Sequence, residues 1–283
     1  MSARRLLSVH KARREDIGDL VTRRPVPGQG LEQVDPFLFL NHHGPQTYPP
    51  GNHGLPFGPH PHRGFETVTF ILAGNLAHRD TGGGESVVEA GGVQWMTAGR
   101  GLIHAELSPE SFMREGGPLE ILQLWVNLPA RLKMTEPNYV PVAAEEIPAV
   151  EPAPGVVMRA VSGGERAPVS SLTGVMLAMV ELAPGSSATL PAPAGRSVFF
   201  YMVNGAARIG PGEVPEHHLA QVGDGEGVEV SSDSGCRILY GHADPIGEPV
   251  VAHGPFVMNT REEILQALQD YRSGVFGDPA ALG

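Results

Sequence analysis

Short runs of apolar and β-branched residues recur along the chain, and each ends at a group of turn-forming residues. The clearest runs are PFLFL, ETVTFILAG, LEILQLWVNLP, SVFFYMVNGAARIG and GVEVSSDSGCRILYG. Runs of this length and spacing predict strands rather than helices, and many short strands joined by turns are typical of a β-sandwich or barrel. The pattern therefore predicts an all-β fold.

One segment, NTREEILQALQDYRSG near the end of the sequence, has the pattern of a helix. Thr260 and Glu263 have the spacing of a capping box, while Ile264, Leu268 and Tyr271 form one apolar stripe. A single stripe of this kind is typical of a helix that packs on a larger body. We expect a short C-terminal helix that packs on a β-domain.

The two halves of the chain resemble each other weakly. FETVTFILAGNLAHRDTG aligns with SVFFYMVNGAARIGPG when Gly74 is placed on Gly205, which suggests a duplicated β-domain. Between the halves, residues 136–155 are rich in Pro, Ala and Glu, as is typical of a surface connector. We predict an N-terminal domain in residues 1–135, a linker in 136–155 and a C-terminal domain in 156–283.

Composition narrows the class of protein. The 283 residues include 37 glycines and 27 prolines, which disfavours a helix bundle. A formal charge of −11 leaves no broad basic face, so we expect no direct nucleic-acid or membrane binding. The single cysteine, Cys236, excludes an intramolecular disulfide, and no stretch has the pattern of a signal peptide or a membrane span. We expect a cytoplasmic monomer in which Cys236 is buried.

Two pairs of polar residues have the spacing of metal ligands. His60 and His62 are separated by one residue, so on a strand their side chains point to the same face. His104 and Glu106 form a second such pair about two strands later, which is enough chain to return beside the first pair. Three imidazoles and one carboxylate can then converge on one ion.

This ligand set suits a mid-series divalent metal, because it extends the arrangement of two His and one carboxylate found in non-haem Fe(II) oxygenases. An octahedral ion with four protein ligands keeps two positions open for oxygen activation or Lewis-acid catalysis, whereas structural zinc sites are closed and usually contain Cys. Glu66 shares the face of the histidines if the alternation continues from His62 through Gly64. It is then a ligand, a base or, as we favour, a carboxylate that holds a ligand imidazole by a hydrogen bond.

The polar pairs do not recur in the second half of the chain. At the offset of the alignment, their counterparts are Pro191, Pro193, Gly235 and Arg237. We therefore expect no metal site in the C-terminal domain. Of the other histidines in the first half, we expect His42, His43 and His53 to be solvated loop residues, while His78 is either exposed or faces the site.

The residues around these pairs resemble the pirin family of the cupin superfamily. The similarity lies in PHPHRGFETVTFILAG and GGVQWMTAGRGLIHAE, and it extends to VDPFLFL near the start and HGPFVMNTREEILQALQDYRSGVFG near the end. Gly54, His60, His62 and Glu66 meet the general cupin pattern. The stretch NHHGPQTYPPGNHG departs from the family, and its histidines are candidates to line the mouth of the pocket.

The resemblance implies a bicupin, with two jelly-roll barrel domains of which only the first binds metal. It implies a divalent metal, usually Fe(II), at the positions of His60, His62, His104 and Glu106, with Mn, Co, Ni, Cu and Zn as alternatives. Some pirin-like proteins are quercetin 2,3-dioxygenases, so a flavonol and O₂ are the expected substrates, with Glu106 or Glu66 as the base. The alternative is an iron-binding, redox-sensitive regulator that binds a transcription factor or a metabolic enzyme.

Overall fold

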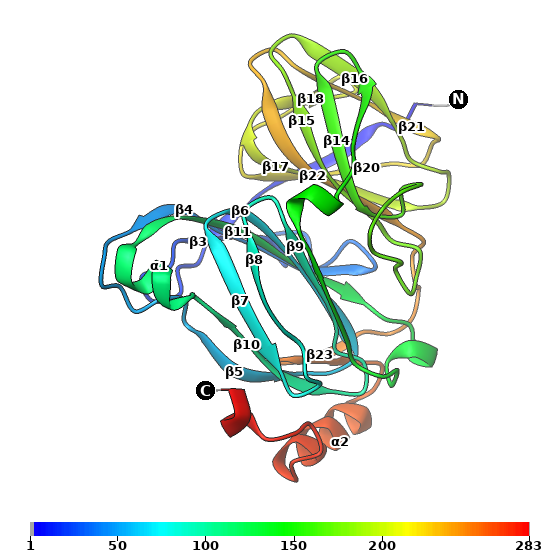
Figure 1. Cartoon of the computed structure of the whole chain (residues 1–283). Coiled ribbons are helices and arrows are strands. Elements are labelled where there is room, and N and C mark those ends of the chain that lie inside the picture. Colours follow the sequence, from blue (N-terminus) through cyan, green and yellow to red (C-terminus); the bar gives the residue numbers. More distant parts are fainter. Residues whose placement is uncertain (1–2, 283) are drawn as a thin grey trace. The chain divides into compact units, whose positions relative to one another are not determined.

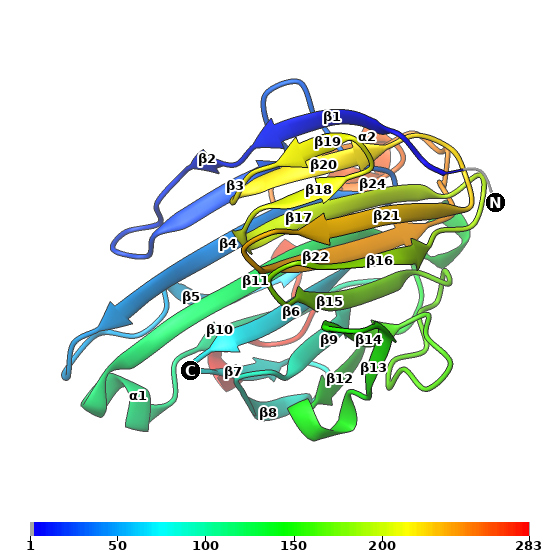
Figure 2. The same ribbon diagram turned by 90° about the horizontal axis from the view of Figure 1, so that it is seen from above.

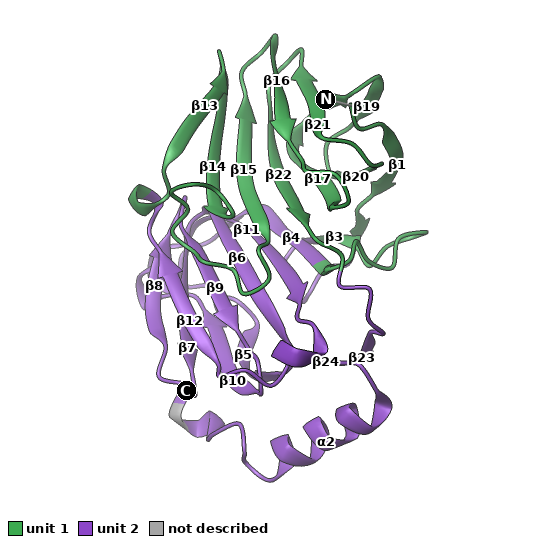
Figure 3. Ribbon diagram, turned by 90° about the vertical axis from the view of Figure 1, so that its right-hand side faces the viewer, with its two compact units in different colours: residues 1–14, 23–39, 145–245 green, residues 15–22, 40–144, 246–283 purple. Residues whose placement is uncertain are grey.

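The structure is a computed structural model that describes residues 3–282, and it is built mainly of β-strands (Figure 1). The chain forms two compact units (Figure 3), which we call unit 1 (residues 1–14, 23–39 and 145–245) and unit 2 (residues 15–22, 40–144 and 246–283). Each unit contains a four-stranded sheet and a larger sheet, both antiparallel. The prediction of an all-β bicupin with a short C-terminal helix is confirmed.

Unit 2 contains a four-stranded sheet and a larger sheet. The four-stranded sheet consists, in order, of β5 (Phe57–His62), β10 (Leu102–Leu107), β7 (Asn75–Asp80) and β8 (Glu85–Glu89). The larger sheet includes, in order, β12 (Asn138–Val142), β9 (Val93–Thr97), β6 (Phe65–Ala73), β11 (Gly117–Asn127) and β4 (Phe37–Tyr48), whose residues from 40 onward belong to this unit. Shorter elements are α1 (Glu110–Glu115), η1 (Ala130–Leu132), η2 (Ala144–Glu146), β23 (Val251–His253), β24 (Phe256–Met258), α2 (Arg261–Arg272) and η3 (Pro279–Leu282).

Unit 1 also contains a large and a small sheet. The large sheet consists, in order, of β1 (Leu6–Lys11), β20 (His218–Val222), β17 (Ser197–Gly205), β22 (Cys236–Ala243), β15 (Met176–Leu182), β14 (Val156–Ser162) and β13 (Ala149–Ala153). The small sheet consists of β16 (Ser186–Pro191), β21 (Gly227–Ser232), β18 (Ala207–Ile209) and β19 (Gly212–Val214). Figure 2 shows β1 alongside β20 at the edge of the large sheet. The short strands β2 (Arg13–Arg14) and β3 (Thr22–Val26) pair with each other.

The strand orders of the two units match. The order β5, β10, β7, β8 of unit 2 corresponds to β16, β21, β18, β19 of unit 1, and β9, β6, β11, β4 corresponds to β20, β17, β22, β15. Gly74 and Gly205 lie at the ends of the matching strands β6 and β17, with φ of 79° and 68°. Glycine suits both places because a side chain is strained at positive φ. The duplication read from the sequence is therefore present in the topology.

The constant offset used in that alignment is wrong for the small sheets, because the connections differ in length. Residues 63–64 join β5 to β6, whereas residues 192–196 join β16 to β17. Of the expected counterparts of the ligand pairs, Pro193, Gly235 and Arg237 consequently lie outside strands β16 and β21. In those strands, Leu190, Val228 and Val230 are buried in the apolar core of unit 1.

The units divide the chain differently from the expected domains 1–135 and 156–283. Part of the expected linker, residues 138–142, forms β12 and pairs with β9. Pro141 is accommodated because β12 is the edge strand of its sheet. The residues that follow the second barrel, 246–283, belong to unit 2 and not to unit 1.

Helix α2 packs on unit 2 through its apolar stripe and contacts mainly β24 and β23. Ile264 and Ala267 of the helix share one buried cluster with Ile103 of β10 and with Phe256. The helix begins at the predicted capping box, in which Thr260 Oγ1 accepts a hydrogen bond from the amide of Glu263 at 3.2 Å. The predicted helix and its packing role are confirmed. Among the described residues, no helix has both the length and the hydropathy that a membrane crossing requires.

Candidate metal centre

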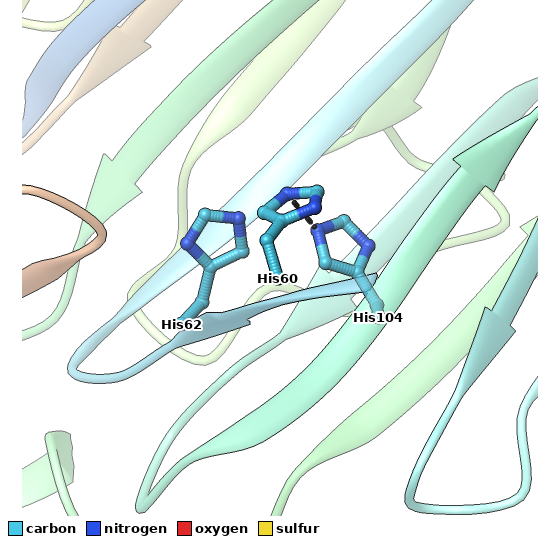
Figure 4. Close-up of side chains that lie close together, drawn as sticks. All are labelled: His60, His62 and His104. Atoms are coloured by element: carbon cyan, nitrogen blue, oxygen red, sulfur yellow. Dashed lines mark hydrogen bonds between the residues drawn. The ribbon is translucent and has the colours of Figure 1, made fainter. Parts of the chain in front are cut away.

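Three histidine side chains converge between the two sheets of unit 2. His60 and His62 lie on β5, and His104 lies on the adjacent strand β10, directly opposite His60. Figure 4 shows the three rings turned toward one another, and their ligand nitrogens all lie within 4.8 Å of one another. The rings of Phe65 on β6 and Trp125 on β11 contact His62, with ring centroids at 5.1 Å and 5.4 Å.

Backbone carbonyls orient two of these imidazoles. His60 Nδ1 lies 2.8 Å from the carbonyl oxygen of Gly58, and His62 Nδ1 lies 3.3 Å from that of Pro255. A carbonyl only accepts, so Nδ1 carries the proton in both rings and Nε2 keeps its lone pair. His60 Nε2 is 2.9 Å from His104 Nε2. These hydrogen bonds thus orient the Nε2 lone pairs of His60 and His62, and hydrogen bonds of this kind also orient the histidine ligands of metal sites.

The imidazoles of His62 and His104 are buried, and both are neutral at neutral pH. Burial, followed by the neighbouring His60, lowers the pKa of His62 to about 3, although the hydrogen bond to Pro255 acts in the opposite direction. Burial and the other histidines lower the pKa of His104 well below its usual value. Nδ1 of His104 is buried and has no hydrogen-bond partner among residues 3–282. Metals bind neutral imidazole, so these residues fit a divalent transition metal.

Glu106 lies on the same face of β10 as His104, but other side chains hold its carboxylate. Thr69 of β6 donates to Oε1 at 3.1 Å, and Gln123 of β11 donates to Oε2 at 2.6 Å. Glu106 is not part of the group of ligand atoms that the three histidines form. The structure therefore brings together three of the four expected ligands and places the fourth, Glu106, next to them in the strand.

Glu66 lies on the opposite face of β6 from the histidines. Phe65 and Thr69 mark the inner face, because they contact His62 and Glu106, and Glu66 is an odd number of residues from both. Its Oε1 accepts hydrogen bonds from Trp95 Nε1 at 3.0 Å and Thr97 Oγ1 at 2.7 Å. Burial raises its pKa, against the effect of these two bonds. The expected hydrogen bond from Glu66 to a ligand imidazole is not formed.

The turn between β5 and β6 explains this difference. Gly64 has φ of 90°, so the chain reverses its alternation between His62 and Phe65. A Cβ at this position would collide with the carbonyl oxygen of Val257.

Strand β7 places His78 on the inner face, which decides between the two positions that the sequence left open for this residue. His78 is 2 % exposed, is paired with Glu106 across the strands, and stacks on Tyr139 with ring centroids 3.8 Å apart. Its Nε2 lies 2.8 Å from Oδ2 of Asp80. A cavity of about 250 Å³ reaches Asp80 and Tyr139. The His-x-Asp spacing in the sequence is the signal that could have revealed this pair.

Two of the histidines expected in a solvated loop are buried in β4. His42 is 0 % exposed and its Nε2 lies 2.9 Å from Glu120, while His43 is 2 % exposed and its Nδ1 lies 2.8 Å from Thr22 Oγ1. That expectation is wrong for both, because residues 41–48 continue the strand that begins at Phe37. His53 is exposed, as expected.

Two barrels of equivalent strand order, one with three converging imidazoles, define the class of bicupins. Comparisons with known proteins identify the family within this class. Residues 19–126 match the Pirin family and residues 177–277 match the Pirin C-terminal cupin domain. A pirin-like protein of Solanum lycopersicum is 39 % identical over 275 residues, covering 94 % of this chain and 90 % of that protein. Human pirin is 38 % identical, with 93 % and 90 % covered. This chain belongs to the pirin family.

The fold is also similar to that of solved structures. The crystal structure of quercetin 2,3-dioxygenase from Acinetobacter baumannii superposes with a TM-score of 0.93 and is 30 % identical. The match covers 98 % of this chain and 100 % of that structure.

Proposed function

We propose that this protein is a metal-dependent dioxygenase that cleaves flavonols of the quercetin type with O₂. The observation that carries the proposal is the convergence of three imidazoles beside a carboxylate between the two sheets of unit 2, with the pKa of His62 and His104 lowered by burial. The likeness to the Acinetobacter baumannii dioxygenase supports the choice of reaction and substrate.

His60, His62 and His104 would hold the metal, which we assign as Fe(II), and Glu106 is the carboxylate available to complete the set. Bound there, a divalent ion would supply Lewis acidity and open coordination positions. The protein supplies the rest: oriented ligands, an apolar wall formed by Phe65 and Trp125, and a base.

Glu106 is the base in this proposal. A carboxylate has about four acceptor positions, and the bonds from Thr69 and Gln123 use two of them. Those two bonds hold the carboxylate in place while a free lone pair accepts the proton of the flavonol 3-hydroxyl. Glu66 is excluded from this role because its side chain points away from the histidines.

The proposed reaction consumes one O₂ and releases one carbon monoxide for each flavonol. Two carbon–carbon bonds of the central ring break, the carbon that bears the 3-oxygen leaves as carbon monoxide, and the remaining oxygen atoms stay in the ester product. No external reductant is needed, because the flavonol itself is oxidised.

The test is oxygen uptake on quercetin by protein purified anaerobically and reloaded separately with Fe(II), Mn(II), Co(II), Ni(II), Cu(II) or Zn(II). We expect uptake that requires metal and is lost in His60→Ala and His104→Ala, while His53→Ala, at an exposed site, keeps it. Full turnover by a folded, metal-free His104→Ala protein would overturn the proposal.

A further inference from the structure

His78 and Asp80 occupy the inner face of β7, beside the strand that carries His104. In the antiparallel pairing of β7 with β10, His78 lies opposite Glu106 and Asp80 lies opposite His104. The ring centroids of His78 and His104 are 5.4 Å apart. Neither His78 nor Asp80 is used in the function proposed above, although both are buried next to its centre.

Asp80 fixes the tautomer of His78. Oδ1 of Asp80 accepts hydrogen bonds from the amides of Gly82 and Gly84 at 2.7 Å and 3.0 Å, and Oδ2 faces His78 Nε2 at 2.8 Å. Burial raises the pKa of this carboxyl, but the hydrogen bonds together lower it below its usual value. The ionised carboxylate only accepts, so His78 Nε2 donates to it.

The other ring nitrogen of His78 is therefore an acceptor in the neutral imidazole. Among the described residues, the His78 ring makes one hydrogen bond, through Nε2 to Asp80. The ring cannot turn freely, because it stacks on Tyr139 with an interplanar angle of 5°. Tyr139 is itself fixed by a bond of 2.5 Å between its hydroxyl and Ser86 Oγ.

We propose that His78 is a specificity-determining residue whose Nδ1 accepts a hydrogen bond from a phenolic hydroxyl of the ligand at the histidine centre. Asp80 and Tyr139 are positioning residues, since they act by fixing the tautomer and the plane of the ring. The site then prefers a polyphenol with a free hydroxyl at the position facing His78 to the same compound with that hydroxyl methylated. The ligand class in this inference rests on the proposed function.

The test measures binding rather than turnover. Quercetin and its single O-methyl derivatives at each hydroxyl other than the 3-hydroxyl are titrated without oxygen into metal-loaded protein, and metal content is measured for each variant. The variants are His78→Phe, which keeps the stacking and removes the acceptor, and Asp80→Asn. Arg79→Gln is the matched control, because Arg79 lies between them on β7 but is exposed and pairs with Glu85.

The wild-type protein is expected to bind quercetin about tenfold more tightly than one methyl derivative, the effect of one neutral hydrogen bond. His78→Phe is expected to abolish this ratio at unchanged metal content. In Asp80→Asn, the amide donates to Nε2 and leaves Nδ1 protonated, so the ratio is expected to reverse in favour of the methoxy acceptor. Arg79→Gln keeps the wild-type ratio.

The inference is overturned if His78→Phe and Asp80→Asn both keep the wild-type ratio for every derivative, or if the wild type shows no preference. These outcomes differ from failure of the proposed function. Absence of oxygen uptake with a preserved, His78-dependent preference contradicts the dioxygenase and leaves the recognition role intact. Normal uptake with no change of preference in the variants contradicts the recognition role alone.

Discussion

At the residue scale, two buried glutamates of unit 2 have different surroundings: Glu106 lies on β10 of the four-stranded sheet and Glu66 on β6 of the larger sheet. Glu106 is held by Thr69 and Gln123 on the inner face of unit 2, whereas Glu66 is held by Trp95 and Thr97 on the other face of β6. We therefore expect the proposed chemistry to depend on Glu106 and not on Glu66.

The isosteric change Glu106→Gln is expected to lower kcat on quercetin by roughly 10²–10⁴-fold, because the amide cannot take a proton. Glu66→Gln is the matched control, and we expect it to keep kcat within about threefold. Steady-state oxygen uptake checks both. Equal losses in the two variants would contradict the assignment of the base.

The sequence was sufficient to predict that the side chains of three histidines converge, but not where the side chain of Glu66 lies. Spacing by two residues on a strand fixes the faces of His60, His62 and His104, because alternation is a local property of the strand. It fails across Gly64, whose positive φ reverses the alternation and whose closeness to Val257 comes from a distant segment. The carbonyl oxygen that orients His62, that of Pro255, comes from the same distant segment.

At the element scale, α2 packs against β23 and β24, and it shares a buried cluster with Ile103 of the strand that carries His104. The helix is fixed at its start by the Thr260 capping box and along its length by the cluster with Ile103. Thr260→Ala is expected to lower the free energy of unfolding by about 1 kcal/mol. Thr260→Ser, which keeps the hydroxyl, should stay near wild type. Urea unfolding of the three proteins measures the effect, and equal midpoints would contradict it.

Lys133 joins three segments of unit 2 after β11. Its Nζ donates to the carbonyl oxygens of Gly64 and Val257 at 2.9 Å and 3.0 Å, and to Asn127 Oδ1 at 2.7 Å. Burial lowers the pKa of this ammonium to about 8 from 10.5, although Glu248 and Glu263 act to raise it. The folded protein thus loses this proton at a lower pH than the unfolded chain.

Between pH 8 and pH 10.5 the unfolded chain binds more protons at Lys133, so this group makes the free energy of unfolding rise with pH. Relative to Lys133→Met, the wild type should gain up to about 3 kcal/mol across this window. Urea unfolding of metal-free protein at several pH values gives the difference. Lys11 is exposed, so the free energy of unfolding of Lys11→Met should change with pH as that of the wild type does. The same pH dependence in Lys133→Met and the wild type would contradict the expectation.

At the scale of the whole molecule, the duplication of the β-domain could be recognised from the sequence. The division of the chain's segments between the two units could not. The central strands β6 and β17 keep their pattern and their terminal glycines, so they align. The connections around the small sheets differ in length, and α2 belongs to unit 2 through a buried cluster, shared with Ile103, that no local pattern records.

Metal binding should stabilise the folded protein by mass action. At a free metal concentration of 100 times Kd, the free energy of unfolding rises by about 2.7 kcal/mol. We expect a rise in Tm on addition of the metal that is absent in His62→Ala and retained in His53→Ala. Hydrogen exchange should show the added protection in β5 and β10. If the metal protected β5 and β10 from hydrogen exchange equally in His62→Ala and in the wild type, the metal would not be bound by His62.

The most direct test of the account is the stoichiometry of carbon monoxide release by the metal-loaded protein with quercetin. We expect one carbon monoxide to be released per O₂ consumed. Both carbon monoxide release and O₂ uptake should be lost in His104→Ala, and added metal should not restore them. Metal bound at the three histidines without carbon monoxide release, or carbon monoxide release that persists in folded His104→Ala, would contradict it.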